Sequence, residues 1–273
     1  MLKQRILTAI VMALVLVATI VFTGNAGASL LFALALFVAV RELFALTTKS
    51  ENTLCILIAI LFASLFWIFN LKSGIRVNFY FSFVGSLLWV GILGYMVRYK
   101  FSGQWATRIK WLHLLMGLAL LWICATGLLF LHRHFDAGGW VLLYTLTLIW
   151  IADIGAYFAG KRFGQNKLAP GISPGKTREG VIGGIVCNLI WMSIVFWISG
   201  GWGMNFWQFI CIGLFTSAMS VVGDLYESIL KREAGVKDSG TLLPGHGGVL
   251  DRVDGVIAAT PIFIFGLYIV GAI

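Results

Sequence analysis

The residues best suited to chemistry in this sequence are its carboxylates, and most of them lie towards the C-terminus. Eight of the 11 Asp and Glu residues fall within residues 153–273, in a chain that is 60% hydrophobic. An ionised side chain at bilayer depth costs about 2.5–3.5 kcal/mol, so it is retained mainly where it faces a polar cavity, a charged partner or a metal. We therefore expect any functional site to be C-terminal.

One group of polar residues has a spacing that would place it on a single helix face. If residues 223–232 are helical, the positions i, i+4, i+7 and i+8 are occupied by Asp224, Ser228, Lys231 and Arg232. A carboxylate binds hard cations through oxygen and basic side chains contact phosphate oxygens, so this face suits a metal-bound polyphosphate. The alternative is a helix end whose basic residues complement its dipole and pair with Glu227.

A glycine-rich segment follows this face. Residues 240–248 contain four glycines and a proline, so the backbone can approach a ligand closely. Within and beside this segment are further polar residues, namely Lys237, Asp238, His246, Asp251, Arg252 and Asp254. Asp251 and Asp254 are one helical turn apart and could simply cap a helix. Together with Asp224, they could equally form an oxygen cage for Mg²⁺.

Two upstream segments add candidates. Asp153, Tyr157 and Lys161 share one helix face, and an intramembrane acid is a site candidate by default. Gly175-Lys176-Thr177 suggests a nucleotide P-loop, but that motif needs a glycine at position 170, which is Pro, and a preceding strand, which is not predicted. We therefore reject a P-loop. Lys176 is still suited to contact phosphate or lipid headgroups, and Thr177 is suited to start a helix.

The elements that must position these groups are membrane helices. Hydrophobic residues make up 60% of the 273 residues and charged residues 11%, which excludes a water-soluble globule. Runs long enough to cross a bilayer predict nine helices, at about 6–22, 28–47, 53–70, 79–97, 111–131, 140–160, 180–199, 205–226 and 254–272. The first is predicted to be an uncleaved span, because it is longer than the core of a secretory signal. The predicted fold class is an all-α, polytopic integral membrane protein.

The basic residues predict the orientation of the chain. With the N-terminus inside, 16 of the 20 Lys and Arg residues lie on the cytoplasmic side, so the C-terminus is expected outside. The net charge of +9 then indicates orientation and contact with anionic headgroups, and we exclude nucleic acid as a partner. We expect an N-terminal membrane region of about five helices at 1–139. A catalytic region of about four helices is expected at 140–273, with cytoplasmic loops at 161–179 and 227–252.

Other polar residues are weaker candidates. His132 and His134 have no companion ligands, which favours a solvated outer loop over a metal site. Arg41 and Glu42 near the inner end of the second span suggest a snorkelling arginine with its local partner, the alternative being a role at the lipid-facing part of the site. The four cysteines lie in apolar runs without a CxxC pair and indicate neither disulfides nor zinc.

The run from Ser228 to Asp254 resembles the signature of phosphatidate cytidylyltransferase, also called CDP-diacylglycerol synthase. It reads Ser-Ile-Leu-Lys-Arg, four residues, Lys-Asp-Ser-Gly, and then Leu-Pro-Gly-His-Gly-Gly-Val-Leu-Asp-Arg-Val-Asp from Leu243 onward. Asp153 with Ala156-Tyr157, and Ser173-Pro174 with Lys176-Thr177, are similar to the upstream elements of the family. The resemblance covers residues 140–273; the first five helices match only in being hydrophobic.

The resemblance implies a membrane enzyme that condenses CTP with phosphatidic acid to give CDP-diacylglycerol and pyrophosphate. It implies Mg²⁺ as cofactor, with a monovalent cation such as K⁺ as a second candidate. By position in the motif, Asp224 and Asp251 would be the leading metal ligands, with Asp254 and Ser228 beside them and Lys231 and Arg232 on phosphates. The substrate-binding residues implied are Lys237, Asp238, His246, Gly247, Gly248, Arg252, Asp153, Tyr157, Lys176 and Thr177.

The expected partners are CTP, phosphatidic acid and the lipid bilayer, with a homodimer as a further candidate. The expected location is the bacterial inner (cytoplasmic) membrane, with the active site facing the cytoplasm. Two alternatives stay open. An ion-coupled transporter would distribute its acids across the membrane, and another CTP-using lipid enzyme, such as a polyprenol kinase, would transfer a phosphoryl group.

Overall fold

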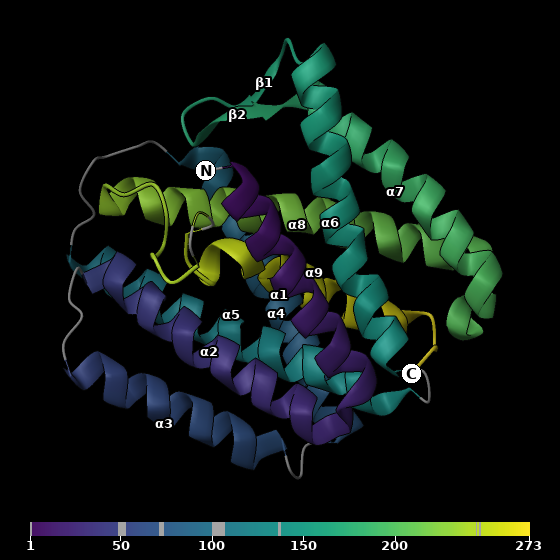
Figure 1. The fold of residues 1–273 in the computed structure, drawn as a ribbon, viewed down its shortest axis with the longest axis horizontal. Coiled ribbons are helices and arrows are strands. Elements are labelled where there is room, and N and C mark those ends of the chain that lie inside the picture. The colour runs from purple at the N-terminus through teal and green to yellow at the C-terminus, as the bar shows by residue number, and fades with distance from the viewer. Residues whose placement is uncertain are drawn as a thin grey trace. The chain divides into compact units, whose positions relative to one another are not determined.

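The computed structural model describes residues 2–48, 53–70, 74–99, 107–135, 138–243, 245 and 247–273. These residues form nine α-helices and one short hairpin (Figure 1). In chain order the elements are α1 (Leu2–Phe22), α2 (Gly24–Thr48), α3 (Thr53–Asn70), α4 (Ile75–Arg98), α5 (Thr107–His134), α6 (Gly138–Phe163), β1 (Lys167–Ala169), β2 (Ser173–Thr177), α7 (Arg178–Ser199), the 3₁₀ turn η1 (Gly200–Gly203), α8 (Phe206–Ala234) and α9 (Leu250–Ile269).

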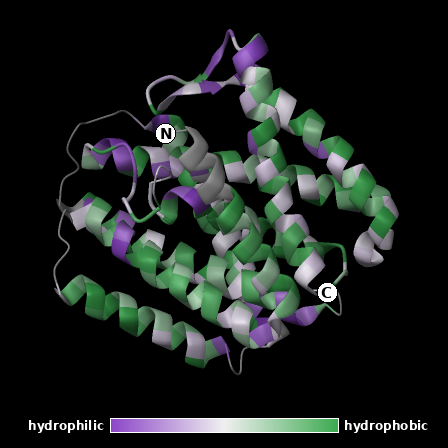
Figure 2. Ribbon diagram, in the orientation of Figure 1, coloured by the Kyte–Doolittle hydropathy of each residue, from purple (hydrophilic) through white to green (hydrophobic). Residues whose placement is uncertain are grey.

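The helices are suited to a lipid environment. Among the described residues, eight helices, α2 to α9, are long and apolar enough to cross a membrane, and α1 adds the apolar segment Ile10–Phe22. Figure 2 shows hydrophobic colour along most of the helices and hydrophilic colour on the hairpin between α6 and α7. Large apolar side chains such as Phe22, Val97 and Trp197 are at least 80% exposed, as expected of surfaces that face lipid. The prediction of an all-α polytopic membrane protein is confirmed.

The chain forms two compact units, which interleave along the sequence. Unit 1 comprises Met1–Asn78, Ser102–Leu143 and Ile229–Asp254, and unit 2 comprises Phe79–Phe101, Tyr144–Ser228 and Gly255–Ile273. The end of α8, the signature loop and the start of α9 therefore belong to the same unit as α1, α2, α3 and α5. The predicted division of the membrane regions near residue 139 stays a prediction.

In unit 1, α2 packs against α1, α3 and α5. A Cβ at Gly117 of α5 would lie 2.6 Å from Leu43 Cδ2, so the glycine permits close approach of α5 to α2. Arg133, near the end of α5, donates to Ser29 Oγ of α2 at 2.8 Å and to the carbonyl oxygen of Asn70 in α3. This arginine therefore ties three helices together.

The outer histidines differ from expectation. His132 and His134 lie in the last turn of α5 and not in a loop. The ring nitrogens of His132 are 2.9 Å from Ile20 O and 3.0 Å from Asn25 Oδ1, and the His134 ring stacks on Phe130. The helix continues because its basic and aromatic residues find partners on α1 and α2 and within α5.

In unit 2, α6 and α7 approach closely through small residues. A Cβ at Gly155 would lie 2.9 Å from Gly183 O, and a Cβ at Gly183 would lie 3.0 Å from Gly155 O. Small residues at such a crossing let two membrane helices pack backbone against backbone. Asn188 of α7 donates from Nδ2 to Leu148 O at 2.8 Å and to Ser217 Oγ at 2.7 Å, which ties α7 to α6 and α8.

The segment predicted as the loop 161–179 contains an antiparallel hairpin, β1–β2, that the sequence did not predict. It leads from α6 directly into α7 (Figure 1). Thr177 Oγ1 accepts from Gly180 N at 3.1 Å and caps α7, as its predicted place at a helix start requires. Lys176 therefore lies on a strand, but the P-loop is still excluded by Pro170.

The second predicted loop, 227–252, is shorter than expected. Helix α8 continues to Ala234 and α9 begins at Leu250. Gly235 ends α8 with a φ of +79°, and the amides of Gly235 and Val236 donate to Arg232 O and Lys231 O, both at 3.0 Å. The predicted helical face that carries Ser228, Lys231 and Arg232 is therefore present.

Candidate active site

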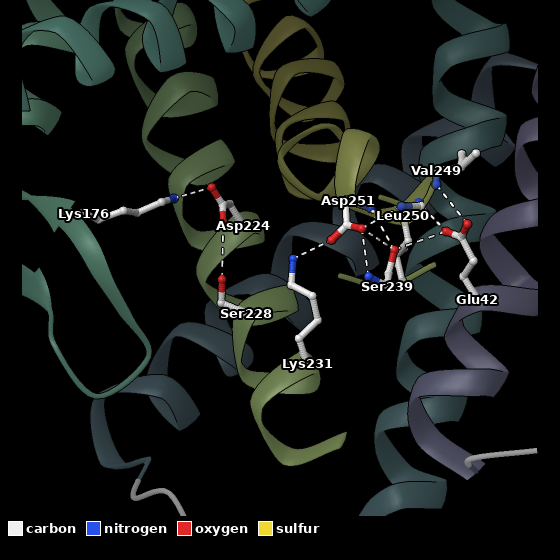
Figure 3. Close-up of polar contacts among 10 residues, drawn as sticks. Glu42, Lys176, Asp224, Ser228, Lys231, Ser239, Val249, Leu250 and Asp251 are labelled. Atoms are coloured by element: carbon white, nitrogen blue, oxygen red, sulfur yellow. Dashed lines mark hydrogen bonds and ion pairs between the residues drawn. The ribbon is translucent and has the colours of Figure 1, made fainter. Parts of the chain in front are cut away.

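The carboxylate of Asp251, in the first turn of α9, is the best-organised charged group of the signature. Its Oδ1 is 2.6 Å from Lys231 Nζ on α8. Its Oδ2 accepts from Ser239 N at 2.8 Å, from Ser239 Oγ at 2.9 Å and from Gly248 N at 2.8 Å (Figure 3). The side chains of Lys231 and Asp251 are only 14% and 4% exposed. Because both oxygens are occupied in a buried place, the carboxylate is held in one orientation.

The local sequence explains how the loop wraps around this carboxylate. Gly247 has a φ of +81°, and its carbonyl accepts from Leu243 N at 2.9 Å, which closes a tight turn. A Cβ at Gly247 would lie 2.6 Å from Asp251 Oδ2, so no larger residue fits beside the carboxylate. The position of Asp251 at the N-terminus of α9 also suits a negative charge.

A second carboxylate, Glu42 of α2, reaches the same loop. Glu42 is only 8% exposed, and its Oε1 accepts from Val249 N at 3.0 Å while its Oε2 accepts from Leu250 N at 2.7 Å. Ser239 Oγ lies 3.3 Å from Glu42 Oε2. Sequence reasoning placed Glu42 with a local partner, yet these contacts join it to residues about 200 positions later. An acid inside an apolar span was the available signal.

Asp224, in unit 2, has a looser environment. Its Oδ2 forms an ion pair with Lys176 Nζ of β2 at 2.5 Å, and its Oδ1 is 3.5 Å from Ser228 Oγ, one helical turn further along α8 (Figure 3). The side chains of Lys176 and Asp224 are 25% and 32% exposed. This pair can therefore exchange its partners with solvent or a ligand more readily than a buried pair can.

Unit 2 also contains a cavity of about 760 Å³ beside Lys176. Four predicted substrate-binding residues line it together: Asp153, Tyr157, Lys176 and Thr177. Lys161 joins them and lies 5.9 Å from the centre of the Tyr157 ring. Most of the remaining wall is apolar, with side chains such as Ile172 and Leu225. The cavity is thus lined by two lysines, one of them paired with Asp224, and by Asp153, next to a surface suited to hydrocarbon.

The other predicted site residues have diverse surroundings. Arg232, Lys237, Asp238 and Arg252 are exposed, and Asp254 is half-buried on α9. Gly247 and Gly248 support Asp251, as described above, and do not require a ligand to explain their place. His246 lies outside the described residues.

The chemistry of these donors fits a hard cation, although the predicted shared cage stays a prediction. Among the described residues, no three His, Cys, Asp or Glu side chains are grouped so that they could hold a metal ion. Asp224 lies in unit 2, whereas Asp251 and Asp254 lie in unit 1. Asp224 and Asp251 each form an ion pair with a lysine ammonium through one carboxylate oxygen. Carboxylate oxygens are also the ligands that Mg²⁺ prefers.

Comparison with known proteins agrees with the signature. A phosphatidate cytidylyltransferase of Haemophilus influenzae is 38% identical over 99% of this chain and all of its own length. Proteins of the same name from Pseudomonas aeruginosa and Staphylococcus aureus are each 42% identical, over 62% and 54% of this chain and 61% and 55% of their own lengths. The model of the cytidylyltransferase family matches residues 3–270. The chain therefore belongs to the cytidylyltransferase family.

Proposed function

We propose that this protein transfers the cytidylyl group of CTP to phosphatidic acid, giving CDP-diacylglycerol and pyrophosphate. The observation that carries the proposal is the convergence of three signature residues, Lys231, Ser239 and Gly248, on the carboxylate of Asp251. The relative that matches this chain over its whole length bears the name of that activity. Neither a polyprenol kinase nor a transporter is favoured by a comparable observation.

The reaction needs positioning and charge neutralisation more than a strong base. A phosphate oxygen of phosphatidic acid attacks the α-phosphorus of CTP and forms the new P–O bond. The bond between that phosphorus and the oxygen bridging to the β-phosphate breaks, and pyrophosphate leaves with the electron pair. The attacking phosphate is already anionic near pH 7, so no proton has to be removed by His246.

Mg²⁺ is the cofactor that we propose, with Asp224 and Asp251 as its main ligands, Asp254 and Ser228 beside them, and K⁺ as a candidate second cation. When bound, Mg²⁺ would offset the negative charge that accumulates on the phosphates. Lys231 and Lys176 form ion pairs with the two carboxylates. With a cation on the carboxylates, these ammonium groups would be available to phosphate oxygens, together with Arg232 and Lys237.

The cavity of unit 2 is the proposed place of phosphatidic acid. Its apolar wall suits the glycerol and acyl portions, while Lys161 and Lys176 suit the phosphate. With the predicted orientation, both lysines lie on the cytoplasmic side, where CTP is available. We therefore propose the inner membrane of a bacterium as the location, with the site facing the cytoplasm. A homodimer stays a prediction that the mass of the detergent-solubilised particle would test.

The experiment is a turnover assay with purified protein in detergent, CTP, phosphatidic acid and Mg²⁺, in which lipid and nucleotide products are resolved by mass. CDP-diacylglycerol and pyrophosphate in equal amounts are expected. A lipid phosphate together with CDP would indicate a kinase. Unchanged substrates with folded protein, at all Mg²⁺ and K⁺ concentrations tried, would contradict the proposal.

A further inference from the structure

A buried carboxylate from the N-terminal part of the chain holds the loop that shapes the signature site. Glu42 lies on α2 and accepts from the amides of Val249 and Leu250 at 3.0 Å and 2.7 Å. Amides at the start of a helix have no partner inside the helix, so they need acceptors from elsewhere. Glu42 supplies two of these acceptors at the start of α9, and Asp251 supplies the one for Gly248 N at 2.8 Å.

The hydroxyl of Ser239 lies within hydrogen-bonding distance of both carboxylates. Its Oγ is 2.9 Å from Asp251 Oδ2 and 3.3 Å from Glu42 Oε2. A hydroxyl has a single proton to donate, and the shorter distance favours Asp251. The carboxylate of Glu42 therefore limits the orientations that the Ser239 hydroxyl can adopt. A change at Glu42 would alter the donors that fix Asp251 Oδ2, and with them the direction of Oδ1 (Figure 3).

The neighbouring glycines indicate that the loop is shaped around Glu42. A Cβ at Gly240 would lie 2.6 Å from Glu42 Oε1, and a Cβ at Gly248 would lie 2.5 Å from Glu42 Oε2 and 2.3 Å from Ser239 Oγ. Real Cβ atoms do not approach oxygen so closely, so any larger residue at either position would displace the carboxylate. Neither glycine has a positive φ. The close approach of Glu42, joined at Gly248 by Ser239, therefore explains these two glycines without a special backbone conformation.

We propose that Glu42 is a positioning residue for cytidylyl transfer, acting through Ser239 and the first amides of α9 to orient the carboxylate of Asp251. This proposal rests on the proposed function. Glu42 acts through the loop and is not itself a catalytic residue. Helix α2, which the signature does not include, is then part of the active site.

The main test compares Glu42→Gln with Arg133→Gln. Arg133 is a matched control, because its half-buried side chain also ties α2 to other helices of unit 1, through Ser29 Oγ and Asn70 O, and is not part of the site. In Glu42→Gln we expect kcat to fall and the Mg²⁺ concentration at half-maximal rate to rise, one or both by about 10-fold to 100-fold. Arg133→Gln should lower thermal stability but leave both kinetic values near wild type. Equal kinetic effects in the two variants would overturn the proposal.

A second readout does not depend on turnover. Hydrogen–deuterium exchange of metal-free protein in detergent should show faster exchange in the peptide that holds Ser239 to Asp251 for Glu42→Gln, and not for Arg133→Gln. Unchanged exchange in Glu42→Gln would overturn the positioning role. Absence of CDP-diacylglycerol synthesis by wild-type protein would contradict the proposed function, while leaving the exchange result interpretable.

Gly240→Ala tests the same role with Glu42 still in place, and a double-mutant cycle with Glu42→Ala checks that the two positions act together. Gly240→Ala should displace Glu42 and reduce kcat in the wild-type background. In a Glu42→Ala background the obstructing atoms are gone, so Gly240→Ala should cause little further loss. Equal losses from Gly240→Ala in both backgrounds would mean that the glycine acts independently of Glu42, and would overturn the proposal.

Discussion

The two lysine–aspartate pairs of this protein differ in how firmly they are held. Asp251 has both carboxylate oxygens occupied by Lys231, Ser239 and Gly248, and its side chain is 4% exposed. Asp224 has one short ion pair and one contact of 3.5 Å, and its side chain is 32% exposed. The first carboxylate is fixed by the backbone of its own loop, whereas the second depends on a lysine from a hairpin. Asp251 is therefore suited to be a preorganised ligand for a cation, whereas Asp224 is suited to a contact that can change its partner.

The largest effect is expected from Asp251→Asn. Loss of the negative charge removes the proposed cation ligand, and because such a cation contributes several kcal/mol to stabilising the transition state, activity should fall by about 100-fold or more. Because the variant also breaks the buried ion pair with Lys231, its thermal stability should fall, but folded and membrane-inserted protein should still be recovered, as measured by yield and size-exclusion profile. Loss of folded protein would instead assign Asp251 to capping α9.

Breaking the more buried of the two pairs should destabilise the protein more. Lys231→Met leaves a buried carboxylate without its cation and should destabilise the protein by about 3 kcal/mol. Lys176→Met breaks a more exposed pair and should cost about 1 kcal/mol or less. Thermal unfolding of the two variants in the same detergent checks this order. Equal shifts would contradict the distinction between a fixed and an adaptable pair.

Lys176→Met should act mainly on substrate binding. Removal of one charge-assisted hydrogen bond, worth about 1.5 kcal/mol or more, should raise KM for phosphatidic acid in mixed micelles by about 10-fold. The change in kcat should be smaller. A fall in kcat with unchanged KM would mean that Lys176 stabilises the transition state and does not contribute to binding of the lipid.

The smallest effect is expected from His134→Ala, at the C-terminal end of α5. The variant removes a ring that stacks on Phe130 with centroids 4.9 Å apart, which is worth about 1 kcal/mol. Activity should stay within about two-fold of wild type. A large loss at constant yield would bring this region into the site.

The sequence predicted the helices well because bilayer-length apolar runs are long and unambiguous. The apolar run of the eighth helix was predicted to end at residue 226 and its polar face to continue to residue 232, and α8 continues to Ala234. Charged residues ended the apolar run there, but Lys and Arg are good helix formers that can extend their charges to the interface. The strands β1 and β2 are three and five residues long and carry no alternating apolar pattern that would have revealed them.

The candidate site was predictable in its residue types and only partly in its contacts. The spacing of Asp224 and Ser228 gave their shared helix face, and the glycines gave the tight loop. The contact of Glu42 with Leu250 spans 208 positions, and no local pattern carries such information. Likewise, the pairing of Lys176 with Asp224 depends on the hairpin, so it could not be inferred from spacing.

The most direct test of the central claim follows the phosphorus atoms of CTP. Wild-type protein in detergent would receive phosphatidic acid, Mg²⁺ and CTP labelled with ³²P at either the α or the γ position. Transfer of the cytidylyl group predicts that α-label enters the lipid and that γ-label appears in pyrophosphate. Entry of γ-label into the lipid, or of neither label, would contradict the account.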